Sequence, residues 1–131
     1  MSLATVYGGA TRTRGPQNLG GPNGTQATTA TTDPSGAAAG YSTKNQRYLW
    51  MHLDTSTSNE NRTVTVYGFI HAFGVWFPLK TPAGTAVTTG AISDSVSTFV
   101  FEIAGVDRVY FKINGALHAT DEFYAACNTI E

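Results

Sequence analysis

Three histidines and a pair of adjacent carboxylates are the side chains in this sequence best suited to bind a metal ion. His52, His71 and His118 are spread through the chain, and His118 precedes Asp121 and Glu122. A metal site usually shows ligands two or four residues apart, or several clustered Cys, His, Asp and Glu side chains. His52 and His71 instead stand beside apolar residues at strand positions, which is typical of packed or interfacial histidines. Asp121 and Glu122 lack a surrounding loop of alternating oxygen ligands, so we predict a solvated hairpin end there. We expect neither a metal ion nor a cofactor.

Asp107 is the other candidate for acid–base chemistry, because its neighbour Arg108 offers a charged partner. Both flank a predicted turn, where an aspartate commonly accepts hydrogen bonds from turn amides, and we favour that role. A hydrolase would need a cleft that gathers Asp107, His118 and Asp121, and no nucleophile, phosphate-loop or dinucleotide motif accompanies them. Cys127, the single cysteine, falls on the apolar side of a predicted strand, which predicts a buried, inert thiol. The sequence therefore predicts a protein that is not an enzyme.

Composition argues against several classes of partner. Eight Lys and Arg against nine Asp and Glu give a net charge of -1 over 131 residues, and no basic stripe is visible. Nucleic-acid binders usually carry such a stripe, so we expect no nucleic-acid partner. No apolar run approaches the roughly 20 residues that a bilayer span requires, and the first residues lack the pattern of a secretory signal. We expect one domain without membrane spans, folded in the cytoplasm, where a single cysteine stays reduced.

Short β-strands are the elements that would position these residues. Positions 63–79, TVTVYGFIHAFGVWFPL, are the densest apolar and aromatic run, with Gly74 at a turn and Pro78 at an edge or an end. We predict a central hairpin here, with the polar stretch 54–62 as a hairpin loop that leads into it. Alternation of apolar and polar side chains predicts further strands at 46–53, 95–103, 108–114 and 120–128. The predicted fold class is all-β, a small β-sandwich or barrel of about six to eight short antiparallel strands.

Residues 1–40 differ in composition from the predicted β-domain at 41–131. Gly, Thr and Ala dominate them, and large apolar side chains are rare. Such a segment cannot offset an ordering entropy of about 1–2 kcal/mol per residue by its own burial, so we predict an extended arm. We expect a neighbouring subunit or a larger assembly to order this arm; the alternative is an arm folded on its own domain. The loop 80–94, rich in the same residues, is a candidate contact loop.

Aromatic residues are numerous in the predicted domain. We expect about half of them to fill the core, because aromatic rings dominate the burial in cores as well as in interfaces. Rings that share one outer face would either stack against sugars or form a subunit interface. The aromatic residues in question are Tyr48, Trp50, Tyr67, Trp76, Phe77, Tyr110 and Tyr124. The candidate interface residues, those of the arm included, are Tyr7, Arg12, Arg14, Trp50, His71, Trp76 and Phe77.

Three stretches together resemble the small β-domain capsid decoration (cement) proteins and related minor head structural proteins of tailed bacteriophages. They are the Gly/Thr/Ala arm before Tyr41, the hairpin VYGFIHAFGVWFPL and the later segment EIAGVDRVYFKING. The resemblance implies a non-enzymatic protein of the virion, assembled in the host cytoplasm, that binds the outer capsid surface, often at symmetry axes. Its implied partners are the major capsid protein or copies of itself as a homo-oligomer. The resemblance carries over no catalytic residue.

On this basis we expect cross-bracing of the shell, in which the domain sits over a junction while the arm lies along a neighbouring subunit. Linking two modest contacts raises the effective concentration of the second, so that attachment becomes strong. Two other functions stay open at this point. A carbohydrate-binding or host-recognition module would display several aromatic residues on one face, whereas a tail or head–tail connector protein would form rings or polymers in solution.

Overall fold

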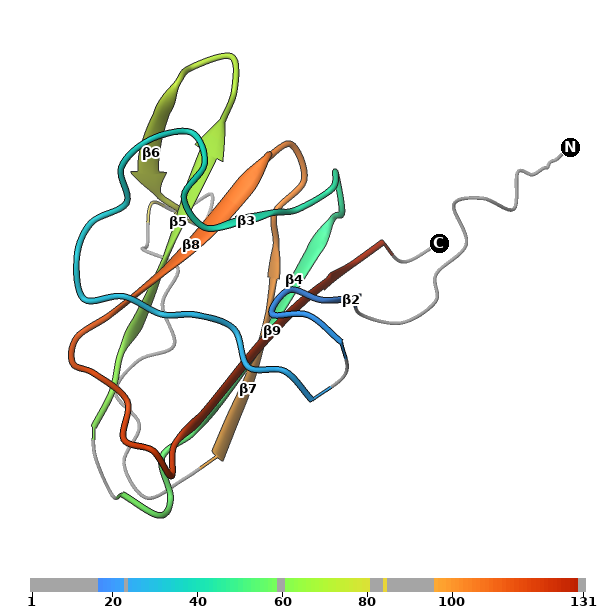
Figure 1. Cartoon of the computed structure of the whole chain (residues 1–131). Coiled ribbons are helices and arrows are strands. Elements are labelled where there is room, and N and C mark those ends of the chain that lie inside the picture. Colours follow the sequence, from blue (N-terminus) through green and yellow to red (C-terminus); the bar gives the residue numbers. More distant parts are fainter. Residues whose placement is uncertain (1–16, 23, 59–60, 81–83, 85–95, 130–131) are drawn as a thin grey trace, which may run out of the picture.

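The computed structural model describes residues 17–22, 24–58, 61–80, 84 and 96–129, and this part of the chain is all-β, without helices. Its strands form two four-stranded sheets that face each other as a sandwich (Figure 1). The first sheet has the order β2-β9-β4-β7, and the second has the order β3-β8-β5-β6. The strands are β2 (Gln17–Asn18), β3 (Tyr41–Ser42), β4 (Tyr48–Asp54), β5 (Val64–Ile70), β6 (Val75–Pro78), β7 (Val96–Glu102), β8 (Arg108–Ile113) and β9 (Glu122–Asn128).

The order of these strands is that of a two-sheet jelly roll. Along the chain each strand lies in the other sheet from its predecessor, except in the β5–β6 hairpin. The named strands all pair antiparallel, with β4 between β7 and β9 and with β5 between β6 and β8. Eight strands wound into two packed sheets are the architecture of a jelly roll. The sequence predicted a β-sandwich or a barrel, and the chain forms the sandwich.

The core lies between the sheets and consists of alternate residues of each strand. In β4, Leu49, Met51 and Leu53 are buried, while the residues between them are half-exposed. β8 and β9 show the same alternation, and the rings of Phe111 and Phe123 meet edge-on with centroids 5.1 Å apart. This period of two is the pattern of a strand with one face on a core. Each buried side chain of this size contributes about 1.5–3 kcal/mol by leaving water.

The predicted central hairpin is present, but the loop before it is not a hairpin loop. β5 and β6 pair antiparallel, and β6 is an edge strand, as Pro78 required. The chain after β4, by contrast, crosses from the first sheet to the second, where it forms β5. β5 cannot pair with β4, because both edges of β4 are paired, one with β7 and the other with β9. The prediction of a hairpin loop at 54–62 is therefore wrong. Polar turn residues indicate that the chain reverses but not which sheet the next strand joins.

Part of the predicted arm is packed on the domain itself. β2 pairs with β9, and the amide of Ala27 donates to the carbonyl of Phe123 at 3.0 Å. Further along, the amide of Ala30 donates to the carbonyl of Phe111 at 3.1 Å, in a parallel bridge to β8. The small side chains of this segment let its main chain approach the edges of both sheets. For the described residues between 17 and 40, the chain's own domain therefore supplies ordering contacts.

Candidate functional site

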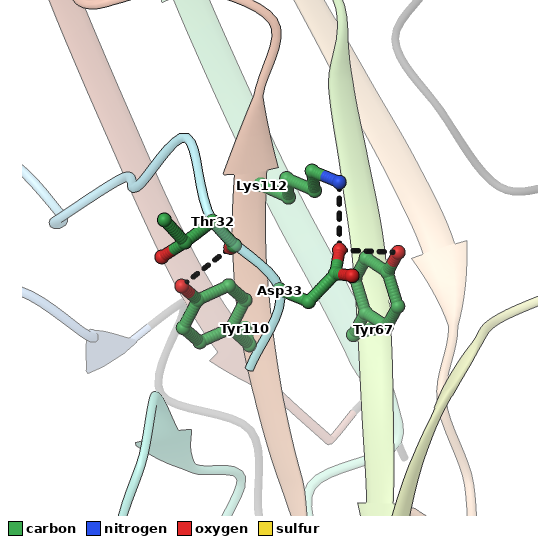
Figure 2. Close-up of polar contacts among 5 residues, drawn as sticks. All are labelled: Thr32, Asp33, Tyr67, Tyr110 and Lys112. Carbon is green, nitrogen blue, oxygen red and sulfur yellow. Dashed lines mark hydrogen bonds and ion pairs between the residues drawn. The ribbon is translucent and has the colours of Figure 1, made fainter. Parts of the chain in front are cut away.

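A segment that we call the strap, residues 31–40, crosses the outer face of the second sheet (Figure 1). Outward-facing side chains of β5 and β8 hold its first part, as Figure 2 shows. Tyr110 Oη donates to the carbonyl oxygen of Thr32 at 2.8 Å. Asp33 Oδ1 accepts from Lys112 Nζ at 2.6 Å and from Tyr67 Oη at 3.3 Å. The strap is therefore bonded to two neighbouring strands at once.

Main-chain carbonyls hold the second part of the strap. The guanidinium of Arg108 donates to the carbonyls of three consecutive residues, 38–40, at 2.8 to 3.2 Å. Trp76 Nε1 donates to the carbonyl of Gly36 at 2.8 Å. These carbonyls belong to residues outside the strands, so no sheet partner satisfies them. The side chains of Arg108 and Trp76 supply the hydrogen bonds instead. Arg108 thus clamps the strap. Its position at the start of a predicted strand did not indicate this role.

The ion pair between Lys112 and Asp33 is the electrostatic part of this contact. The hydrogen bond with Lys112 and the charge of Lys112 lower the pKa of Asp33 below its usual 3.8. The hydrogen bond with Asp33 in turn raises the pKa of Lys112. The Asp33 side chain is 70% exposed and that of Lys112 is 35% exposed, so solvent and salt screen the pair. The ion pair therefore orients the strap more than it stabilises it.

Aromatic rings on the outer face of the second sheet form a layer beneath and beside the strap. The ring centroid of Trp76 lies 5.1 Å from that of Phe69 and 5.8 Å from that of Tyr110. Phe69 is only 3% exposed, and His71 packs edge-on against it at 5.4 Å. Trp76, a predicted interface residue, is consequently half-buried within the molecule, with its N–H bonded to the strap.

The turn between β5 and β6 carries an exposed apolar tip, which we define as residues 71–75, HAFGV. Phe73 is 67% exposed and Val75 is 56% exposed, more than any other large apolar side chain in the described ranges. The amides of Phe73 and Gly74 both donate to the carbonyl of Ile70, which closes the turn. Gly74 has φ of 70°, a left-handed conformation that glycine adopts without strain. The tip is a closed turn whose apolar side chains point into solvent.

The outer face of the first sheet, which we call the open face, has no comparable strap among the described residues. Tyr48, Trp50 and His52 alternate along β4 with buried residues, and Tyr124 lies on β9 beside them; all four are half-exposed. Trp50 Nε1 donates to Asn128 Oδ1 at 2.8 Å, and the ring centroids of His52 and Tyr124 are 6.3 Å apart. A depression of about 180 Å³ lies on this face. This surface presents aromatic rings to the outside.

The prediction that about half of the named aromatic residues fill the core is wrong. All seven are half-buried, on an outer face or, for Phe77, on the edge strand β6. The six other than Phe77 occupy outward positions of their strands, while alternate inward positions carry the core residues. The described core rings are instead those of Phe111 and Phe123, while Phe69 is buried on the outer side of the second sheet.

The residues that a hydrolase would need are not brought together. Asp107 lies before β8, and its Oδ2 accepts from the amide of His71 at 2.7 Å. Asp121 lies beyond the other end of β8, and its carboxylate accepts from Ser58 Oγ at 2.5 Å and from the amide of His118 at 2.9 Å. Asp107 thus accepts from an amide of the distant β5–β6 turn and not, as had been predicted, from the turn that it flanks. The prediction of a solvated hairpin end is wrong for Asp121, which is 2% exposed and closes the loop after β8.

Cys127 lies in the core, as its register predicted, and burial raises the pKa of its thiol to about 12. At neutral pH such a thiol carries almost no thiolate, the nucleophilic form. Within the residues that the structure describes, no three His, Cys, Asp or Glu side chains are arranged to hold a metal ion. No helix in the described part of the chain is long and apolar enough to cross a membrane.

The predicted interface residues are distributed over several surfaces rather than gathered in one. Trp50 lies on the open face, His71 in the tip, Trp76 beneath the strap and Phe77 on β6. Tyr7, Arg12 and Arg14 lie outside the described residues, as does most of the candidate contact loop 80–94. Sequence reasoning did not single out Phe73, although an aromatic residue beside a turn glycine was an available signal of exposure.

Comparisons with models of protein families, with curated proteins and with solved structures found no match for this chain. Functional inference therefore starts from the tip, the strap and the open face.

Proposed function

We propose that this protein is a non-enzymatic structural protein of a virus particle, a capsid decoration protein of a tailed phage. It binds the outer shell and braces neighbouring capsomers. The observation that carries the proposal is the apolar tip at 71–75, on which Phe73 and Val75 are exposed. Five consecutive residues without Asp, Glu, Lys or Arg, at the end of a hairpin, leave apolar surface in water, and burial against a partner protein removes it.

The hairpin beneath the tip is held in place, which favours docking. Phe69 and Trp76 pack against each other at its base, and the amide of His71 is bonded to Asp107. A preorganised contact loses less conformational entropy on binding than a flexible one does. Aromatic side chains seated in a pocket of the partner commonly dominate interface energies. Full burial of Phe73 would contribute about 1.5–3 kcal/mol to attachment.

The first sixteen residues supply a second contact in this proposal. They precede β2, which is an edge strand of the first sheet. Since the described residues from 17 to 40 are bonded to their own domain, residues 1–16, with Tyr7, Arg12 and Arg14, are the part of the predicted arm left for a neighbouring subunit. Two linked contacts raise the effective concentration of each other, so modest affinities suffice for bracing.

The jelly-roll order of the strands agrees with this proposal as an analogy. Jelly rolls occur in viral capsid proteins and in lectin domains, and also in cupins. One fold hosts many functions, so this agreement supports the proposal less than the exposed tip does.

Co-sedimentation with assembled capsid shells tests the proposal. We expect the full chain to bind shells to a fixed copy number, and Phe73→Ser to weaken binding about tenfold or more, which corresponds to about 1.4 kcal/mol. The matched control is Val100→Ser, which removes an apolar side chain of 48% exposure from β7 of the other sheet and should leave binding unchanged. Failure of the full chain to bind, or equal binding by Phe73→Ser, would refute the proposal. Rings or polymers formed without shells would instead favour a connector protein.

A further inference from the structure

A row of paired residues crosses the open face from β2 to β7. Asn18 pairs with Ala126, Ala126 pairs with Trp50, and Trp50 pairs with Val100. Directly paired residues project from the same face of a sheet, so a methyl group stands between an amide and an indole. This small residue between two larger ones leaves room for the depression of about 180 Å³. The residues that line it are Asn18, Trp50, Met51, His52, Tyr124, Ala125 and Ala126.

A hydrogen bond orients the Trp50 indole beside the depression, and the rings of His52 and Tyr124 lie next to each other. Trp50 Nε1 donates to Asn128, which lies diagonally across from it, so the indole is anchored on the side away from Tyr124. On the next pair of the ladder, the rings of His52 and Tyr124 lie 6.3 Å apart and are tilted by 32°. Successive outward residues of a strand are about 7 Å apart, so the indole and the second pair of rings flank the methyl group of Ala126. An indole that is already oriented loses little entropy on binding.

Polar groups stand at the margins of this aromatic site. The Asn18 carboxamide is held by the amide of Gly20 and the carbonyl of Pro22, which leaves one amide hydrogen and one lone pair for a ligand. Asp54 and Glu122 form the next pair along β4 and β9, beyond His52 and Tyr124 on the same face. Asp54 Oδ1 already accepts from the amide and the hydroxyl of Ser56 at 2.9 and 2.7 Å, so Asp54 Oδ2 and the exposed carboxylate of Glu122 are the oxygens that could accept from ligand hydroxyl groups. The site thus combines apolar ring faces with an amide and acceptors at its rim.

The charges decide which ligand class fits. None of the lining residues is Lys or Arg, and two carboxylates stand at one end, so phosphate, sulfate and other anions are disfavoured. The small volume suits one ring rather than a peptide or a drug-sized molecule. A pyranose has an apolar face of C–H groups that stacks on aromatic rings and an edge of hydroxyl groups that hydrogen-bonds to amides and carboxylates. We propose that the open face binds a neutral hexose, most simply the terminal residue of a glycan.

This function is separate from the attachment to a shell and does not rest on it. The tip belongs to the second sheet, whereas the depression lies on the outer face of the first sheet. A particle decorated with many copies would display many such sites. Binding of a single ring at a shallow site is weak, with a dissociation constant on the order of 1 mM, and an array of copies strengthens it through multivalency.

Titration of the isotope-labelled full chain with methyl glycosides of glucose, galactose and mannose tests this site. We expect at least one neutral glycoside to shift the Trp50 indole N–H and the Ala126 amide at tens of millimolar. Ala126→Leu fills the depression and should abolish the shifts, while Ala126→Ser, which keeps the small volume, should retain them. Tyr67→Phe, on the opposite sheet, is the control for a general change of the fold. A folded Ala126→Leu that binds as the wild type does would overturn the proposal, as would the absence of any response.

Discussion

Arg108 gives the strap the hydrogen bonds that a paired strand would otherwise supply. Its guanidinium reaches three consecutive carbonyls, and the fixed fork of donors suits such an arrangement better than a lysine ammonium would. The neighbouring Asp107 holds the amide of His71 in the same region. Two adjacent charged residues at the start of β8 therefore organise the strap and the base of the tip.

Replacement of Arg108 tests this clamp at the residue scale. Arg108→Ala leaves the carbonyls of residues 38–40 to water or unpaired, and we expect it to lower the free energy of unfolding by about 1–3 kcal/mol. Arg108→Lys should recover only part of the loss. The measurement is urea unfolding, with Arg47→Ala as the matched control, because Arg47 forms an exposed ion pair with Glu102 and should matter little. Equal stabilities of Arg108→Ala and Arg47→Ala would show that the clamp is unimportant.

The Lys112–Asp33 pair predicts a small, defined dependence of stability on pH. The pKa of Asp33 is lowered in the folded protein, so its contribution is present above the unfolded value of 3.8 and is lost as pH falls through the lower folded value. The pKa of Lys112 is raised, so its contribution is present below 10.5 and is lost as pH rises through the higher folded value. Thermal unfolding of Asp33→Asn and wild type should differ slightly at neutral pH and converge well below pH 3.8. A difference that persists in acid would contradict this assignment.

At the scale of elements, one glycine controls how the strap enters β3. Gly40 has φ of 66°, and a Cβ atom added there would overlap the carbonyl oxygen of Val109. Gly74 in the tip has φ of 70°, but nothing lies within 4 Å of an added Cβ. The two glycines thus share a backbone conformation and differ in their surroundings.

Alanine at each position separates backbone strain from steric overlap. We expect Gly74→Ala to cost roughly 1 kcal/mol, the strain of a positive φ alone, and Gly40→Ala to cost roughly 2 kcal/mol or more, because β3 must also move away from β8. Chemical unfolding measures both losses, and hydrogen exchange of the amides in the β3–β8 pairing should rise only in Gly40→Ala. Equal losses for the two variants would mean that the strap is not tightly seated on β8.

The strands could be predicted from sequence, whereas their assembly could not. Leu49, Met51 and Leu53 alternate with outward residues, and that period of two reports directly on a strand with one buried face. The sheet that a strand joins depends on which edges are already paired, a long-range property with no local pattern. The strap leaves no pattern either, because most of the hydrogen bonds that hold it go to its main-chain carbonyls, and its Gly, Ala and Thr residues resemble those of an unordered segment. Phe73 beside the turn glycine Gly74 was a local signal of an exposed side chain. The neighbouring Trp76 and Phe77 were predicted as interface residues instead.

At the scale of the whole molecule, the two outer faces of the sandwich differ. The strap covers aromatic rings on the second sheet, and the open face leaves rings on the first sheet accessible. The tip extends beyond the end of the second sheet, as Figure 1 shows. Attachment through the tip leaves the open face available, so one molecule can bind a shell and a sugar at the same time.

Removal of residues 1–16 tests the bracing part of the proposal at this scale. The truncated chain keeps β2, the strap and the tip, so we expect it to fold with little loss of stability. Its affinity for shells should fall, because the effective concentration supplied by the second contact is lost, while Phe73→Ser should weaken the remaining binding further. Sedimentation binding curves measure both effects. Unchanged affinity of the truncated chain would show that residues 1–16 do not contribute to shell binding, and the tip would be the sole proposed contact.

Electron cryo-microscopy of shells saturated with the full chain is the most direct test of the central claim, attachment through the tip. We expect one jelly roll per binding position, with residues 71–75 against the capsid surface and the ring of Phe73 buried in an apolar pocket. Shells without bound protein, or bound protein with its tip directed into solvent, would contradict it.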